Sequence, residues 1–257
     1  MLGGCSLPPP PSCSPPGWWP GCGSDGSGCR GSTPGVGSPP VDRVTEVGPG
    51  VAAGPPVGVG PHPRPWPIDP RLDPALLTYG DTRNVADRYR YWRMPAIIDD
   101  LDTRRHPFSV AIENWQHDAN IGSIVRSANA FLAQDVHIIG RWRWNRRGAM
   151  VTDRYQHIEH HLELSDLTSW AATRHLPVIG VDNIAGAQPL PGATLPERCV
   201  LLFGQEGPGL SAPALAACAQ VVGITQFGST RSINVAAAAG IVMYEWTRQH
   251  ARQAPPA

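Results

Sequence analysis

Residues 198–211 read RCVLLFGQEGPGLS, an apolar run that breaks into a glycine-rich loop and ends on a serine. A short, fully apolar run of this kind is typical of a strand buried on both faces, as in parallel sheets covered by helices. Gly204, Gly207 and Gly209 give the order GxxGxG, whereas dinucleotide-binding folds use GxGxxG and P-loops end in GK[ST]. Glu206 would repel phosphate. The loop therefore predicts a neutral or cationic ligand read by main-chain groups, with a tight turn carrying an exposed acid as the alternative.

The chain on either side of this stretch alternates apolar runs with helical patterns. Strands are predicted at 108–115, 136–140, 161–165, 177–183, 198–204 and 220–226, and helices at 120–133, 166–176, 212–219 and 233–250. This alternation predicts an α/β fold, a parallel sheet with helices on both faces. Ligands of such sheets bind at the carboxyl ends of the strands, where the loops 116–122, 204–211 and 225–232 fall.

The N-terminal part differs in composition. Residues 1–67 hold 17 of the 29 prolines and 15 of the 28 glycines, with few aliphatic residues. Such a segment cannot bury enough apolar surface to offset the entropy of ordering, so we predict that it is disordered. Residues 68–107 are predicted to form a helical, polar N-terminal extension of the domain that occupies 108–250.

Charge and composition exclude several classes of protein. All 21 basic residues are arginines, which removes the lysine of a P-loop and any Schiff-base lysine. The formal net charge is zero, so a nucleic-acid surface must be local. The start of the chain does not have the pattern of a signal peptide, and no apolar run approaches the ~20 residues of a membrane span. We predict a cytoplasmic protein that does not bind or span a membrane.

Two further loops carry polar residues beside helices. In NIGSIVR (120–126), Gly122 and Arg126 lie four apart, which predicts a guanidinium across the gap at Gly122 and near Asn120. That arrangement suits a phosphate or ribose oxygen, although a lone surface arginine is the alternative. In FGSTRSINVAAAAG (227–240), Ser232 is predicted to cap the last helix, with Asn234 in its first turn. A capped, alanine-rich core helix is the alternative here.

Together the three loops resemble the three ordered motifs of the SpoU (TrmH-like) RNA 2′-O-methyltransferases of the SPOUT superfamily, over roughly residues 108–248. The motifs read Asn120-x-Gly122-x-x-x-Arg126, then Gly204-x-Glu206-x-x-Gly209, then Ile224 with Gly228-x-x-x-Ser232-Ile233-Asn234-Val235. The third motif departs from the family at four positions. Thr225-Gln226 stand where the family usually has Pro-Met, and Ile233 and Ala236 where it usually has Leu and Ser.

The resemblance implies a homodimer with a deep C-terminal trefoil knot, an S-adenosylmethionine cofactor, and methyl transfer to a ribose 2′-hydroxyl of tRNA or rRNA. The catalytic residues that it implies are Asn120, Arg126, Glu206, Ser232 and Asn234. The cofactor contacts that it implies are Gly204, Ile224, Ile233, Phe203 and Gly209. Arg126 is the leading candidate to orient the ribose and help remove its proton. The alternatives are an inactive SPOUT-fold RNA-binding protein and a SPOUT base methyltransferase.

RNA binding requires local positive charge. RWRWNRR (141–147) places Arg141, Arg143, Arg146 and Arg147 among two tryptophans, a combination that suits phosphate contact and base stacking. RNVADRYRYWR (83–93) is a second candidate. HIEHH (157–161) matches neither HExxH nor HxxEH, so we predict a helix-face cluster there and no metal.

Overall fold

The structure is a computed structural model that describes residues 58–115 and 120–251. All of these lie in one compact unit, Ala53–Ala257. The prediction of disorder for residues 1–67 falls mostly on residues 1–57, which lie outside the described residues.

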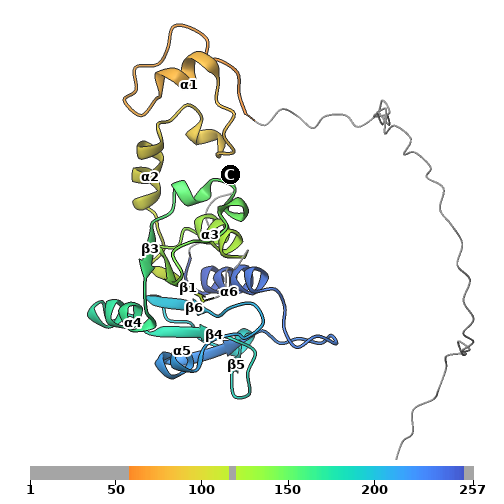
Figure 1. Cartoon of the computed structure of the whole chain (residues 1–257). Coiled ribbons are helices and arrows are strands. Elements are labelled where there is room, and N and C mark those ends of the chain that lie inside the picture. Colours follow the sequence, from red (N-terminus) through yellow and green to blue (C-terminus); the bar gives the residue numbers. More distant parts are fainter. Residues whose placement is uncertain (1–57, 116–119, 252–257) are drawn as a thin grey trace, which may run out of the picture. The chain divides into compact units, whose positions relative to one another are not determined.

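A seven-stranded sheet forms the centre of this unit, in the order β3-β2-β1-β6-β4-β7-β5, with every pairing parallel (Figure 1). The strands are β1 (Phe108–Asn114), β2 (Val136–Gly140), β3 (Ile158–His161), β4 (Val178–Val181), β5 (Gln188–Pro189), β6 (Cys199–Phe203) and β7 (Gln220–Gly223). β6 is the apolar run quoted first in the sequence. It lies between β1 and β4 and is buried along its whole length, as predicted for an inner strand.

Helices cover both faces of the sheet, which confirms the predicted α/β architecture (Figure 1). The α-helices are α1 (Pro74–Tyr79), α2 (Met94–Asp102), α3 (Ile121–Ala130), α4 (Leu164–Thr173), α5 (Ala212–Ala217) and α6 (Val235–His250). The 3₁₀ turns are η1 (Asp87–Tyr89), η2 (Arg146–Ala149), η3 (Thr152–Arg154) and η4 (Leu190–Gly192). One core lies between the sheet and α3 and α6, and the other between the sheet and α4 and α5. The trefoil knot stays a prediction.

One predicted strand was wrong. Residues 161–165 do not form a strand: β3 ends at His161 and α4 begins at Leu164. A capping box starts this helix, because the side chains of Glu163 and Asp166 each accept a hydrogen bond from the other's main chain. HIEHH is therefore not a helix-face cluster. Its last four residues form the edge strand β3, whose polar residues give little of the apolar signal that marks an inner strand.

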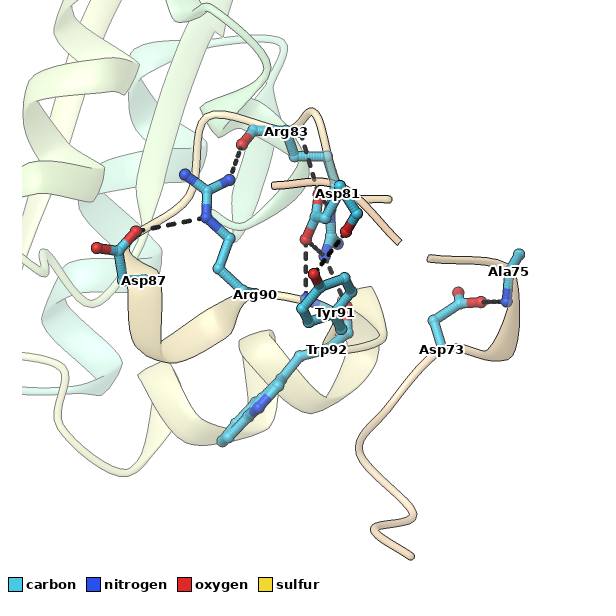
Figure 2. A network of polar contacts seen from close by, with 9 residues as sticks. Asp73, Ala75, Asp81, Arg83, Asp87, Arg90, Tyr91 and Trp92 are labelled. Atoms are coloured by element: carbon cyan, nitrogen blue, oxygen red, sulfur yellow. Dashed lines mark hydrogen bonds and ion pairs between the residues drawn. The ribbon is translucent and has the colours of Figure 1, made fainter. Parts of the chain in front are cut away.

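The N-terminal extension is held together by polar contacts as well as by its short helices. The fully buried Asp81 accepts hydrogen bonds from the guanidinium of Arg83, at 2.6 and 2.8 Å, and from the main-chain N–H of Tyr91 at 2.9 Å (Figure 2). Val59 and Asp81 also exchange main-chain hydrogen bonds, so the ordered contacts begin before residue 68. The division into 68–107 and 108–250 stays a prediction.

Candidate active site

A cavity of about 540 Å³ opens at the carboxyl ends of β4, β6 and β7. Most of its lining comes from four segments of chain: 181–184 after β4, 204–210 after β6, 224 and 226 after β7, and 231–235 at the start of α6. Leu215 of α5 and Ala238 of α6 complete it. Parallel sheets bind their ligands at this edge. The segment after β4 is the one that the sequence did not point to.

The glycine loop after β6 is folded back on itself. Gln205 and Gly209 exchange main-chain hydrogen bonds at 3.1 Å each, which closes a narrow hairpin. A Cβ on Gly204 would lie 2.1 Å from the carbonyl carbon of Gly209. Gly209 itself has φ 74°, and a Cβ there would lie 2.5 Å from a carboxylate oxygen of Asp182. Both positions therefore require glycine, and this brings bare main chain to the cavity wall.

Two carboxylates hold this loop in place, and sequence reasoning missed both. Glu113, fully buried on β1, accepts hydrogen bonds from Ser211 at its N–H (2.8 Å) and its hydroxyl (2.6 Å). Asp182, at the end of β4, accepts from the N–H of Leu210 at 2.8 Å and lines the cavity. The signal that the sequence offered for each of them is an acidic residue at the carboxyl end of a buried strand. Its partners lie far away in sequence, so the pattern alone did not identify them.

A chain of hydrogen bonds joins the three sequence motifs at the rim of the cavity. The side-chain amide of Asn234 donates to the side-chain oxygen of Asn120 at 2.9 Å. Asn120 in turn donates to the carboxylate of Glu206. The α3 N-terminus, the glycine loop and the α6 N-terminus are thus connected through side chains that lie 86 and 114 residues apart in sequence.

The prediction that Ser232 caps the last helix was wrong. The cap is Asn234, whose side-chain oxygen accepts from the N–H groups of Ala236 (2.9 Å) and Ala237 (3.3 Å). Ser232 lies two residues before the cap, exposed on the cavity wall. The same asparagine can bond to Asn120 because its oxygen is used by the helix and its nitrogen is left to donate.

The prediction for Gly122 and Arg126 also needs correction. The space at Gly122 is filled by the main chain of η2, since a Cβ there would lie 2.7 Å from the carbonyl oxygen of Asn145 and 2.8 Å from the N of Ala149. Arg126 is exposed, and within residues 58–115 and 120–251 we find no hydrogen bond or ion pair to its guanidinium. In particular, it does not pair with Glu206.

The predicted site residues fall into two groups, those that line the cavity and those that do not. Gly204, Gly209, Ile224 and Ile233 line the cavity, as do Glu206, Ser232 and Asn234. Phe203 does not line it, because its side chain is fully buried in the core between the sheet and α3 and α6. Asn120 and Arg126 are also absent from the lining, although Asn120 reaches the rim through its bond to Glu206.

Gln226 is a further cavity residue, at one of the positions where the third motif departs from the family pattern. Its side-chain oxygen is buried and has no hydrogen-bond partner in the described part of the chain. A buried acceptor without a donor is costly, so this oxygen is well suited to receive a hydrogen bond from a ligand.

The two described cysteines do not supply a nucleophile. Burial raises the pKa of the Cys199 thiol to about 12 and that of Cys218 to about 11. Thiols with such pKa values stay protonated at neutral pH and react poorly. They behave as small hydrophobes packed in the two cores.

The arginine-rich segment 141–147 presents its charge to solvent. Arg141, Arg143, Arg146 and Arg147 are all exposed, and Trp142 is 68% exposed and stacked on His160, with ring centroids 4.1 Å apart. Trp144 instead packs inward. The side-chain nitrogen of Asn114, at the end of β1, donates to the carbonyls of Arg141 (2.7 Å) and Arg143 (3.2 Å), which fixes the path of the segment beside the sheet.

The second candidate segment, 83–93, uses its arginines internally. Arg83 binds Asp81, Arg90 donates to the carbonyl of Arg83 at 2.6 Å, and Arg93 donates to the carbonyl of Leu72 at 2.9 Å (Figure 2 shows the first two). These guanidiniums fold the extension and are less available to RNA than those of 141–147. Among the described residues, no helix combines the length and apolar character needed to cross a membrane.

Known proteins are similar to this chain in sequence and in fold. A methyltransferase of Mycobacterium avium, described as an uncharacterized tRNA/rRNA methyltransferase, is 34% identical over 151 residues, which cover 54% of this chain and 47% of the relative. The tRNA (guanosine(18)-2′-O)-methyltransferase of Escherichia coli is 24% identical over 160 residues, 61% of this chain and 70% of the relative. The chain spans about half the length of the first curated relatives it matches, 45% to 47% of each.

The fold matches solved SpoU structures. The crystal structure of the SpoU methyltransferase AviRb from Streptomyces viridochromogenes, in complex with AdoMet, aligns with a TM-score of 0.52 and 24% identity, over 65% of this chain and 69% of that one. The family model of the SpoU rRNA methylases matches residues 107–244, more than half of the chain, and this range includes all three motifs that converge on the cavity. The chain therefore belongs to the SpoU rRNA methylase family.

Proposed function

We propose that this chain is an S-adenosylmethionine-dependent RNA methyltransferase that methylates a ribose 2′-hydroxyl of tRNA or rRNA. The observation that carries the proposal is the hydrogen-bonded chain from Asn234 through Asn120 to Glu206 at the mouth of the cavity. It joins the three family motifs into one polar surface. A fold without this chemistry would have no need to align these three side chains.

The cavity fits the cofactor in size and in chemistry. Small-molecule sites range over roughly 300–1,000 Å³, and this cavity measures about 540 Å³. The main chain at Gly204 and Gly209 and the apolar side chains of Ile224 and Ile233 suit a nucleoside. Gln226 offers an acceptor for an amino group such as that of adenine. When bound, S-adenosylmethionine supplies a methyl group on a sulfonium, and its positive charge is compatible with the lining carboxylates, which would repel a dinucleotide.

The residues of the chain would position the target ribose. Methylation of the ribose 2′-oxygen would require this hydroxyl to line up with the methyl group and to lose its proton to water. Arg126 is exposed six residues after Asn120, which is about 1.7 helical turns, and is the candidate to hold the ribose or its phosphate. A guanidinium stays protonated, so we assign it an electrostatic role: its charge lowers the pKa of the nearby hydroxyl. The network of Asn120, Glu206 and Asn234 would hold the rim of the cavity in a fixed geometry, and positioning of this kind lowers the barrier to reaction.

RNA would approach over the segment 141–147. Its four exposed arginines offer phosphate contacts, and Trp142 presents a ring for base stacking. In support of this path, η2, which carries Arg146 and Arg147, packs against Gly122 of α3, the helix that carries Arg126.

A second copy of this chain is the proposed partner of α6. Ile241 and Tyr244 are 43% and 61% exposed and recur at helical spacing after Ala237, which leaves an uncovered apolar stripe along the helix. Exposed apolar stripes of this kind mark interaction surfaces. A homodimer through α6, a knotted C-terminal region and a cytoplasmic location complete the proposal.

The test uses the full chain, a transcript of tRNA and one of rRNA, and mass spectrometry of the nucleosides. Titration calorimetry with S-adenosylhomocysteine should show binding, and ribose-methylated nucleosides should form with the native protein. Arg126→Ala should abolish them, while Arg174→Ala, at the end of α4, should not. Binding of RNA without methyl transfer would support the inactive RNA-binding alternative, and a methylated base would support the base methyltransferase. No binding of S-adenosylhomocysteine would refute the cofactor assignment.

A further inference from the structure

Three side chains that the proposed reaction does not use converge on the outer edge of the sheet. His137 lies on β2, and Glu159 and His161 lie on the edge strand β3. The parallel register pairs His137 with Glu159, and His161 follows two residues later on the same face. The His137 Nδ1 lies 2.8 Å from the His161 Nε2 and 3.8 Å from a carboxylate oxygen of Glu159. One ligand atom from each residue lies within 4.8 Å of the other two.

A fourth residue orients the buried member of this group. The Nε2 of His137 lies 3.0 Å from a carboxylate oxygen of Asp135. A carboxylate only accepts, so Nε2 carries the proton and Nδ1 presents a lone pair toward His161 and Glu159. The ring is fully buried and packs against Trp170, with centroids 4.1 Å apart, which restricts its rotation. A carboxylate behind a ligating histidine is the usual way in which proteins orient such a ligand.

We propose that His137, Glu159 and His161 form a binding site for a divalent transition-metal ion, of which Zn²⁺ fits best. Two imidazoles and one carboxylate are a common set of three protein ligands for zinc, with a fourth position left to water. Nitrogens bound tetrahedrally to zinc lie roughly 3.3 Å apart, given Zn–N distances of about 2.0–2.1 Å. The two imidazole nitrogens at 2.8 Å need to separate by only a fraction of an ångström. Glu159 is half exposed, so its carboxylate can swing to the ion and solvent can reach the open position.

The ion would replace the proton that now lies between the two imidazoles. Without the ion, His161 must donate from Nε2 to the Nδ1 of His137. When the ion binds, the neutral His161 ring carries its proton on Nδ1 instead, which leaves the Nε2 lone pair for the metal. The bound ion would tie the edge strand β3 to β2. Since β3 continues from the arginine-rich segment through η3, the ion would stabilise the sheet edge on which that segment is anchored.

The experiment is titration of the metal-free full chain, prepared without a histidine tag, with ZnCl₂ by calorimetry, together with Co²⁺ absorption spectroscopy. Native protein should bind Zn²⁺ and should show a higher Tm with it. His161→Ala and Glu159→Gln, both on the edge strand, should each lose one equivalent of bound metal and the associated rise in Tm. Asp135→Asn should keep the ligands but weaken binding by about 10- to 100-fold.

His160→Ala is the matched control, because His160 is the neighbouring histidine on the opposite face of β3. It should bind the metal as the native protein does. The same number of bound Zn²⁺ ions in native protein, His161→Ala and Glu159→Gln would overturn the proposal, since the metal would then be bound elsewhere on the chain. Failure of the native protein to bind Zn²⁺ would also overturn it. In that case the group is a hydrogen-bonded Asp–His–His chain.

Discussion

At the scale of single residues, Asn234 has two functions that can be separated. Its oxygen caps α6 and its nitrogen donates to Asn120. Asn234→Ala should lose both and lower the free energy of unfolding by about 1 kcal/mol. Asn234→Ser should keep the cap, because serine caps about as well, but should lose the bond to Asn120 because its side chain is shorter. We expect near-native stability in chemical denaturation and strongly reduced methyl transfer. Native activity in Asn234→Ser would mean that the link to Asn120 has no role in the reaction.

Asp81 makes the extension sensitive to acid. Burial alone would raise the pKa of this carboxyl, but the hydrogen bonds from Arg83 and Tyr91 outweigh it and hold the pKa at about 2, below the ordinary 3.8. A carboxyl whose pKa is lowered on folding stabilises the protein fully above pH 3.8, and that stabilisation is lost as the pH falls toward 2. The shift corresponds to about 2 kcal/mol.

Unfolding is measured between pH 6 and pH 2 for native protein and for Asp81→Asn. The variant should be less stable than native protein at pH 6, and this difference in stability should shrink as the pH falls. Asp87→Asn serves as the control, because the Asp87 side chain in the same extension is 96% exposed. A difference that stays constant over this pH range would exclude ionised Asp81 as its source.

At the scale of elements, the arginine-rich segment should determine how strongly RNA binding depends on salt. Each phosphate contact removed reduces the slope of log K against log[salt] by about 1. Arg141→Ala combined with Arg143→Ala should thus weaken binding of RNA and reduce the slope by about 2. The control is Arg83→Lys. The side chain at this position binds Asp81, and the variant keeps its positive charge. Fluorescence anisotropy at several salt concentrations provides the slopes, and an unchanged slope in the double variant would place the RNA elsewhere.

Elements differed in how well the sequence predicted them. β6 and β1 were evident because strands buried on both faces are continuous apolar runs. β3 was misplaced because an edge strand with only β2 as a neighbour carries polar residues. The order of motifs correctly indicated the cavity at the carboxyl ends of the strands, but Glu113 and Asp182 were missed. Their partners, Ser211 and Leu210, are 98 and 28 residues away, a distance over which local patterns carry no information.

The sequence also did not predict which residue caps α6 or which atoms pack against Gly122. Ser232 and Asn234 are both good caps, and only the path of the chain selects between them. The glycine at position 122 was expected to admit a side chain, whereas it admits another main chain. At position 122 the residue was correctly singled out and its partner was not, whereas for the cap the wrong residue was chosen.

At the scale of the whole molecule, association through α6 is open to direct test. Ile241→Arg places a charge in the exposed apolar stripe and should convert a dimer to monomers without unfolding the chain, since the side chain is 43% exposed. Sedimentation velocity should resolve the two species, and circular dichroism should be unchanged. Ser169→Arg, at an exposed position of α4, should remain dimeric. A native protein that sediments as a monomer at all concentrations would refute the proposed homodimer.

The contact of Gly122 with η2 bears on how this fold acquires new targets. The atoms that lie nearest to Gly122 belong to the main chain of Asn145, Gly148 and Ala149. In the proposed function, substitutions at Arg141, Arg143 or Arg147 would change the surface offered to RNA while the main chain of the segment keeps its packing against α3. The proposed RNA surface and the hydrogen-bonded network of the three motifs could then vary independently of each other.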